Sequence, residues 1–280
     1  MADLKLYNNG EGKILMSAGD RIIRQPYDFG RAFDITNNNA SGAFANNYIK
    51  AESPIANIAN GAFSVVIFKK DTVTFNNSNS VFRFTSLSFS CVIGLGAHDN
   101  TRNYFYNTQS TLTAPKAQVS TNIDKECLLT TVFSTTNFKI KENRTLVNLP
   151  VNIENSSEEY IDFIFGSAAR HFSFSGDIPS LSGNELAIFD REITDGEHFY
   201  RQNNRIGSDW QSTVGMVLYW KMREAEILDF STSQDGSDMR VGVRDFSGNN
   251  HHGQIMNLPA GTLQEQLDWA NANLFVPFIS

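Results

Sequence analysis

Charged residues are scarce in this chain of 280 residues. Only 19% of its residues are Asp, Glu, Lys or Arg, and 23 Lys and Arg stand against 30 Asp and Glu, which gives a formal net charge of -7. An acidic chain without a basic stripe lacks the positive charge with which proteins neutralise DNA phosphates or anionic lipids. We therefore expect its partners to include neither nucleic acid nor membrane.

Cysteine is rarer still, because Cys91 and Cys127 are the only two. Two cysteines are too few for a disulfide scaffold, and these two lack the paired spacing of a zinc site. Free cysteine is among the most buried residue types, so we expect both thiols in or near the core.

Long apolar runs are absent as well. No stretch approaches the roughly 20 apolar residues that cross a bilayer. Residues Met1–Lys5 show no cationic stretch followed by an apolar one, which a secretory signal would need. We expect neither a transmembrane segment nor a signal peptide, and hence synthesis in a cytoplasm.

Neutral polar residues take the place of charge, with 29 Asn, 26 Ser and 18 Thr. Apolar residues alternate with polar or small ones, which is typical of half-buried strands. Three such rows are Leu87, Phe89, Cys91, Ile93 and Leu95; Met216, Leu218, Trp220 and Met222; and Met239, Val241 and Val243. Further short runs rich in Phe, Val and Ile occupy 63–68, 81–85, 128–133, 138–141, 145–149, 160–165, 172–174 and 186–189. Many short strands separated by Asn/Ser/Asp/Gly turns predict an all-β protein of two packed antiparallel sheets.

Helix signals are few. Thr194 with Glu197, and Thr262 with Glu265, each match a capping box, in which the two side chains satisfy each other's backbone amides at a helix start. After the second box, Leu263, Leu267, Ala270 and Leu274 form an apolar stripe. The sequence therefore predicts one or two short surface helices, one of them near 263–273.

Three segments resemble one known family. Asp28–Asp34, followed by Tyr48–Ile49 and Phe63–Val65, is similar to the opening of a LamG-like domain of the concanavalin A-like lectin/glucanase superfamily. Leu186–Tyr200 resembles the closing motif of that family, where an acidic-Arg pair precedes a capped helix. Trp220–Gly253 resembles a third element that commonly precedes the opening motif, so the order is rotated here, which a sandwich with adjacent termini tolerates.

The resemblance implies a concanavalin A-like jelly-roll β-sandwich. It implies one domain over residues 28–280, with residues 1–27 as an N-terminal arm or edge segment. The motif residues it marks are Asp190, Arg191, Thr194, Glu197, Asp245, Ser247, Gly248, His252 and Gly253. Because the family includes lectins, adhesion modules and glycoside hydrolases, the fold alone does not give the chemistry.

No catalytic constellation stands out. Glu159 and Asp162 are the nearest match to the carboxylates of a glucanase, but their spacing places them on opposite faces of a strand. The five histidines include no pair four residues apart, and adjacent His251 and His252 are interpreted as part of a structural turn. We therefore expect no enzymatic activity and no catalytic or cofactor-binding residue.

Calcium is the one cofactor for which the sequence offers weak candidates. Asp229–Gly236 resembles a calcium loop but has Gln234 where the sharp turn requires glycine. A single ion at the sandwich rim would use Asp235 and Asp238, or Asp99. A polar turn without metal is the alternative.

The expected fold and the absence of a secretory signal point to different cellular locations, and the expected functions follow from that difference. LamG-like domains usually work outside cells, whereas this chain shows no secretory signal. Bacteriophage surface and tail components are made in a cytoplasm and released by lysis, so we expect a virion structural or host-recognition component, associated with capsid or tail. Its partners would be other virion subunits or copies of itself, and host-surface glycans. The alternatives are a free carbohydrate-binding lectin and a polysaccharide hydrolase. Sugar-stacking candidates are Trp210, Trp220 and Trp269, with Trp220 favoured as core.

Overall fold

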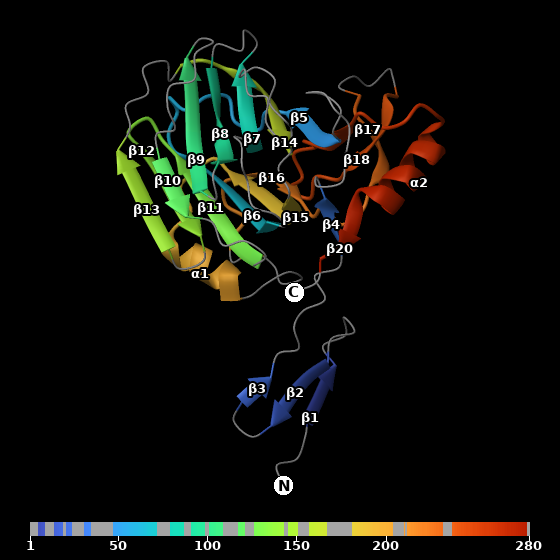
Figure 1. The fold of residues 1–280 in the computed structure, drawn as a ribbon, viewed down its shortest axis with the longest axis horizontal. Helices are drawn as coiled ribbons and strands as arrows, with labels where there is room; N and C mark the ends of the chain where they lie inside the picture. Colours follow the sequence, from blue (N-terminus) through green and yellow to red (C-terminus); the bar gives the residue numbers. More distant parts are fainter. Residues whose placement is uncertain are drawn as a thin grey trace.

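The computed structural model describes residues 5–8, 14–18, 21–23, 31–34, 47–71, 79–86, 91–98, 101–108, 117–120, 126–142, 145–150, 157–166, 181–203, 210, 212–231 and 237–278. Within this part, two large antiparallel sheets form a β-sandwich with two short helices (Figure 1). The all-β class predicted from the alternation is confirmed.

The first sheet has nine strands in the described part of the chain. Their spatial order is β10 (Ala117–Ser120), β9 (Thr101–Thr108), β8 (Cys91–His98), β7 (Asn79–Ser86), β14 (Tyr160–Phe165), β5 (Tyr48–Glu52), β19 (Gly253–Met256), β18 (Met239–Val243) and β17 (Glu226–Asp229). Strands from both ends of the sequence therefore meet where β5 pairs with β19.

The second sheet has eight described strands. The order is β13 (Thr145–Pro150), β12 (Asn137–Glu142), β11 (Glu126–Phe133), β6 (Phe63–Asp71), β15 (Leu181–Phe189), β4 (Arg31–Asp34) and β20 (Phe275–Pro277), with β16 (Met216–Trp220) paired to β15. The chain crosses repeatedly between the two sheets, as when β4 is followed by β5 and β5 by β6.

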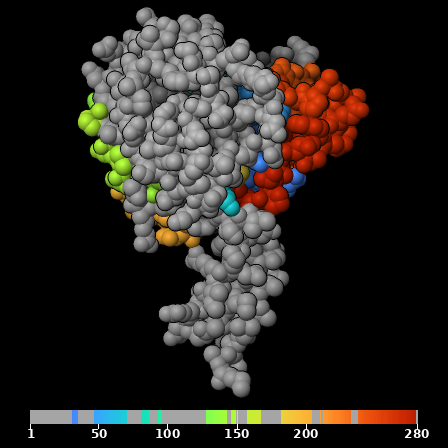
Figure 2. Space-filling model, in the orientation of Figure 1, coloured from blue at the N-terminus to red at the C-terminus, as the bar shows by residue number. Residues whose placement is uncertain are grey.

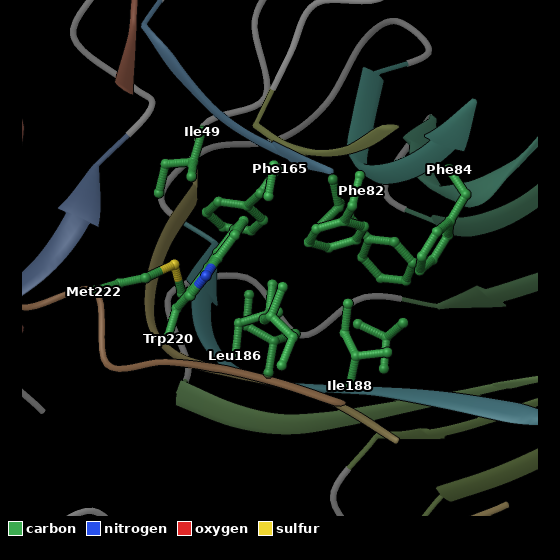
Figure 3. Close-up of a cluster of buried hydrophobic side chains, with 14 of the residues drawn as sticks. Ile49, Phe82, Phe84, Phe165, Leu186, Ile188, Trp220 and Met222 are labelled. Atoms are coloured by element: carbon green, nitrogen blue, oxygen red, sulfur yellow. The ribbon is translucent and has the colours of Figure 1, made fainter. Parts of the chain in front are cut away.

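Aromatic side chains from both inner faces fill the core. The rings of Phe63 and Phe133 stack with centroids 5.0 Å apart, and Phe63 meets Phe84 of the opposite sheet edge-on at 5.0 Å. The ring centroid of Phe163 lies 4.9 Å from that of Phe84 and 5.6 Å from that of Trp220. Each such pair stabilises the fold by about 0.5–1.5 kcal/mol beyond the contribution of the apolar area it buries. Figure 3 shows part of this core, with Ile49, Phe82, Phe84, Phe165, Leu186, Ile188, Trp220 and Met222 labelled.

The C-terminal segment lies beside the strands that open the sandwich. β20 pairs with β4, where Phe275 is opposite Phe33, and β19 pairs with β5, where Ile255 is opposite Ile49. Figure 2 shows the C-terminal residues, orange to red, gathered on one side of the molecule next to blue residues of these early strands. β19 and β20 thus extend the two sheets beside β5 and β4.

Each helix begins at its predicted capping box. Before α1 (Asp195–Asn203), the Thr194 amide donates to Glu197 and the Glu197 amide donates to Thr194, at 3.0 and 3.2 Å. Before α2 (Leu263–Asn273), Thr262 and Glu265 form the same reciprocal pair. The predicted stripe of α2 packs on the main core through Leu263, Leu267, Ala270 and Leu274.

Two details of the predicted alternation are wrong. Met216 lies against a smaller apolar cluster on the outer face of the eight-stranded sheet, and not beside Leu218 in the main core. A β-bulge at Val217 shifts the register with β15, and an extra residue reverses which face the following side chain takes. Met239 is 41% exposed because it opens β18 opposite Asp229, the last residue of edge strand β17.

Some predictions fall outside the described residues. They concern the expected strand at 172–174, residues Asp28–Gly30 of the opening motif, Leu87 and Phe89 of the first alternating row, and the side chains of Cys91 and Cys127. Of residues 1–27, the structure describes β1 (Lys5–Asn8), β2 (Ile14–Ala18) and β3 (Arg21–Ile23), which form a separate antiparallel sheet. Neither helix of the described chain has the length and apolarity needed to span a bilayer.

Candidate functional site

A polar groove of about 830 Å³ lies on the outer face of the nine-stranded sheet, across β5, β19, β18 and β17. We call it the groove. Its lining is mostly polar: Lys50, Ala51, Glu52, Asp229, Phe230, Ser231, Asp238, Arg240, Asn249, Asn250, His251, His252, Gln254 and Met256. These residues come from segments some 200 positions apart in the sequence.

Strand alternation supplies the floor of the groove. Ile49 and Ile255 are buried in the core, so their neighbours Lys50 and Gln254 face outward. Lys50 is opposite Gln254, and Gln254 is opposite Gly242 of β18. Rigid paired strands thus set the spacing of the outward side chains.

Phe230 is the aromatic wall of the groove. Gly242 has no side chain, and Cζ of Phe230 lies 2.8 Å from the place that a Cβ of residue 242 would occupy. The Phe230 ring meets the His252 imidazole edge-on, with centroids 6.0 Å apart. The glycine therefore lets a half-buried aromatic ring lie close over the sheet.

Both cations of the groove are paired. Arg240 donates to both carboxylate oxygens of Asp238, at 2.8 and 2.5 Å, and to Oε1 of Gln254 at 2.6 Å. The hydrogen bonds that Arg240 donates to Asp238 raise the pKa of Arg240 above its ordinary value. Nζ of Lys50 lies 2.9 Å from Asp162 on β14.

The turn between β18 and β19 forms another wall, and Asp245 organises it. One oxygen of Asp245 accepts the amides of Tyr219 and Ser247, both at 2.9 Å, and the other accepts the Ser247 hydroxyl and the His251 amide at 2.8 and 3.0 Å. The left-handed backbone of Gly248, at φ 91°, allows the turn to tighten. His251 and His252 therefore belong to a structural turn, as predicted, and they also line the groove.

His252 is held as a neutral acceptor. The Asp245 amide donates to its Nδ1 at 3.1 Å, which assigns the ring proton to Nε2. Burial lowers the pKa of His252 below its ordinary value of 6.5. At neutral pH this imidazole therefore offers the groove a polar ring without charge.

The predicted closing motif lies elsewhere and fixes α1. The Arg191 guanidinium donates to both oxygens of Glu197, at 2.9 and 2.6 Å, and its Nε donates to the Val214 carbonyl at 2.8 Å. The Asp190 amide donates to the Gly215 carbonyl at 2.8 Å. None of Asp190, Arg191, Thr194 or Glu197 lines the groove, so these residues tie the helix start to the sandwich.

The Arg191–Glu197 ion pair predicts that the stability of the fold falls in acid. The hydrogen bond from Arg191 is the main cause that lowers the pKa of Glu197 from 4.5 to about 2. Because the folded-state pKa lies below the unfolded one, Glu197 stabilises the fold above pH 4.5, and this contribution is lost as the pH falls toward 2. We expect Glu197→Gln to lower the free energy of unfolding by about 1–2 kcal/mol at neutral pH and by much less near pH 2, measured by urea unfolding.

The matched control is Glu265→Gln, which changes the capping glutamate of α2. Glu265 has the same bonds to its threonine, but no arginine of the described chain pairs with it, so its pH dependence should be weaker. An equal loss for Glu197→Gln at both pH values would contradict a role for the charge.

The calcium candidates are not brought together in the described structure. Asp238 gives both oxygens to Arg240, while Asp99 and Asp235 lie outside the described residues. Where the chain is described, no three His, Cys, Asp or Glu side chains form a group that could hold a metal ion.

The sugar-stacking candidates are also elsewhere. Trp220 is fully buried in the core, as favoured, and donates from Nε1 to the His251 carbonyl at 2.8 Å. Trp269 packs on the main core, and Trp210 packs against Phe189 and Tyr219. The aromatic ring in the groove is that of Phe230, which the sequence analysis did not single out.

Lys50, Arg240 and Gln254 of the groove were not predicted from the sequence either. Each is a polar residue on a strand with at least one buried neighbour, so the alternation could have marked it as outward-facing. That signal does not say that β5 pairs with β19, which is what brings Lys50 to Gln254.

Neither a protein-family model nor a curated protein sequence matches the chain. Solved structures that match the chain include domains LG4-5 of the mouse laminin alpha1 chain, at 7% identity and a TM-score of 0.41, covering 59% of this chain and 43% of that one. Trypanosoma rangeli sialidase is 12% identical with a TM-score of 0.45, covering 75% and 33%. Tailspike protein 2 of the Escherichia coli O157:H7 bacteriophage CAB120 is 8% identical with a TM-score of 0.43, covering 72% and 31%. The chain spans less than half of each of these structures.

Proposed function

We propose that this chain is a non-enzymatic binding module, LamG-like in fold, that recognises a carbohydrate in the groove. The groove itself carries the proposal: about 830 Å³ of open volume on a rigid sheet, lined by amide, imidazole and hydroxyl groups beside one aromatic ring. Protein amides and hydroxyls hydrogen-bond sugar hydroxyls, and Phe230 supplies an apolar surface for the C–H face of a sugar ring. A few polar groups around an apolar contact are typical of small-ligand sites.

The carboxylates of the groove support binding over hydrolysis. A glycosidase needs one carboxylic acid whose pKa is raised so that it can donate a proton. Asp229 instead accepts the amides of Ser231 and Asp238 at 2.9 and 3.0 Å, which lowers its pKa, and Asp238 is paired with Arg240. Asp162, a candidate in the sequence, is paired with Lys50.

Groove variants test the proposal. We expect saturable binding of the purified chain to one or more immobilised oligosaccharides, and a loss of affinity of about tenfold or more for Phe230→Ala and for Gln254→Ala, because the first removes the apolar contact and the second a hydrogen-bonding amide. Phe199→Ala and Gln264→Ala are matched controls, since Phe199 on α1 and Gln264 on α2 are exposed and lie outside the groove.

Two variants are used because one of them could lose binding by unfolding. Phe230 is half-buried, so Phe230→Ala needs a check by circular dichroism, whereas Gln254→Ala removes an outward side chain. Binding that survives both changes, or that the controls reduce equally, would exclude the groove as the site.

We further propose that the module acts as a structural or host-recognition component of a bacteriophage particle. The low-charge composition rich in Asn, Ser and Thr supports this role, and residues 1–27 would serve as the arm that contacts other subunits. Mass spectrometry of purified bacteriophage particles should find this chain in a fixed ratio to the other particle subunits. Glycan binding by a chain that is absent from particles would favour a free lectin instead.

A further inference from the structure

We infer that the groove selects uncharged, hydroxyl-rich sugars and discriminates against sugars that carry sialic acid, uronic acid or sulfate. This rests on the proposed function, because it names the ligand class of the same site. The inference comes from the charges that face the groove and from the partners they already have.

Arg240 is one of the two cations of the groove with which an acidic sugar could pair. Its Nε and Nη2 donate to the two oxygens of Asp238 at 2.8 and 2.5 Å, which is the fork arrangement that a ligand carboxylate would need. Its Nη1 donates to Gln254 at 2.6 Å. An anionic ligand would therefore have to displace Asp238 before it could bind in the same geometry.

Lys50 is the second cation and has its own anion. Its ammonium lies 2.9 Å from Asp162, whose side chain is only 19% exposed. Moving Lys50 to a ligand would leave that carboxylate partly buried without its partner, which costs free energy. The lysine is thus held on the floor of the groove by the strand beside it.

Among the lining residues that the structure describes, carboxylates outnumber cations. Glu52, Asp229 and Asp238 are carboxylates, while Lys50 and Arg240 are the cations, and His252 is kept neutral by the Asp245 amide. Asp229 stays ionised because two backbone amides donate to it. A ligand anion in this lining meets repulsion that a neutral sugar avoids.

The groups that remain open suit hydroxyls. The side chains of Asn250 and His251 make no hydrogen bond to any residue that the structure describes, and the amide nitrogen of Gln254 is likewise uncommitted there. An amide both donates and accepts, which matches the paired donor and acceptor character of a sugar hydroxyl, and the imidazole ring adds polar nitrogens. Phe230 beside them adds an uncharged contact surface.

Matched pairs of sugars test the inference. Immobilised neutral oligosaccharides of glucose, galactose, mannose and their N-acetylated forms are each compared with a sialylated, uronic-acid or sulfated counterpart, using the full chain. We expect the bound neutral members to exceed their acidic counterparts by about tenfold in affinity. Equal or tighter binding of the acidic members would overturn the inference and leave the proposed function standing, whereas binding to neither class would overturn the proposed function.

Asp238→Asn gives a second, independent readout. This change removes one carboxylate and frees Arg240, so the preference for neutral sugars should fall at least about fivefold, through tighter binding of the acidic members. Asp268→Asn is the matched control, because Asp268 is an exposed carboxylate on α2 outside the groove. An unchanged preference in Asp238→Asn would contradict the assignment of selectivity to this ion pair.

Discussion

Replacing Glu185 by alanine should lower the free energy of unfolding by about 3–5 kcal/mol, one of the largest effects expected of a single change in this chain. The Glu185 side chain is 1% exposed, and one of its oxygens pairs with Arg201, whose side chain is also 1% exposed. The other oxygen accepts from Arg223 at 2.9 Å. Removing the carboxylate takes away the buried anion that Arg201 and Arg223 share.

The position of Arg201 explains why it cannot escape to water. It belongs to the last turn of α1, and its guanidinium lies 4.6 Å from the centre of the Trp210 ring and 5.5 Å from that of Phe68. Burial and the charge of Glu185 together raise the pKa of Tyr219 nearby. The helix is thus attached to the sheet through a charged contact surrounded by aromatic rings.

A double variant separates charge from volume. Glu185→Leu combined with Arg201→Met removes both charges while keeping apolar bulk, so it should cost clearly less than Glu185→Ala. Urea unfolding followed by tryptophan fluorescence measures both variants. A loss below about 1 kcal/mol for Glu185→Ala would contradict a large contribution of this buried ion pair.

Gly253→Ala should cost about 2–3 kcal/mol, because the site has no room for a methyl group. A Cβ at residue 253 would lie 2.3 Å from Cγ2 of Ile49 and 2.8 Å from Cζ2 of Trp220 and Cγ2 of Val243. Ile49, Trp220 and Val243 all belong to the main core, so their side chains are packed on other sides and cannot rotate away. The measurement is the urea midpoint at constant m-value.

Gly196→Ala is the control for that change. Gly196 lies in the first turn of α1, and a Cβ there would meet only the Thr194 hydroxyl, at 3.9 Å. Alanine has the better helix propensity, so this substitution should be neutral or slightly stabilising. Equal destabilisation by both substitutions would contradict the steric argument for Gly253.

Local sequence patterns were sufficient for the elements of the fold but not for the site. The alternation around Val241 and Val243 identified a strand, and Thr262 with Glu265 identified the start of α2, because both signals depend on near neighbours. The bulge at Val217 depends on how β16 pairs with β15, and that pairing is a tertiary property. The same limit applies to Met216, whose face the bulge reverses.

The groove shows this limit most clearly. Lys50 and Gln254 are about 200 residues apart, and only the pairing of β5 with β19 places them side by side. Asp245 and His252 were marked by resemblance as parts of a turn, and the structure adds that this turn forms a wall of the groove. Phe230 gave no signal at all, because its place depends on the glycine at position 242 of the neighbouring strand.

Hydrogen exchange followed by mass spectrometry, with and without the tightest-binding oligosaccharide, tests most directly whether the groove is the binding surface. The expected result is slower amide exchange at 50–52, 229–231, 238–240 and 249–256, with no change in α1. Protection confined to residues 190–197 and α1, or unchanged exchange around the groove at saturating sugar, would contradict the assignment.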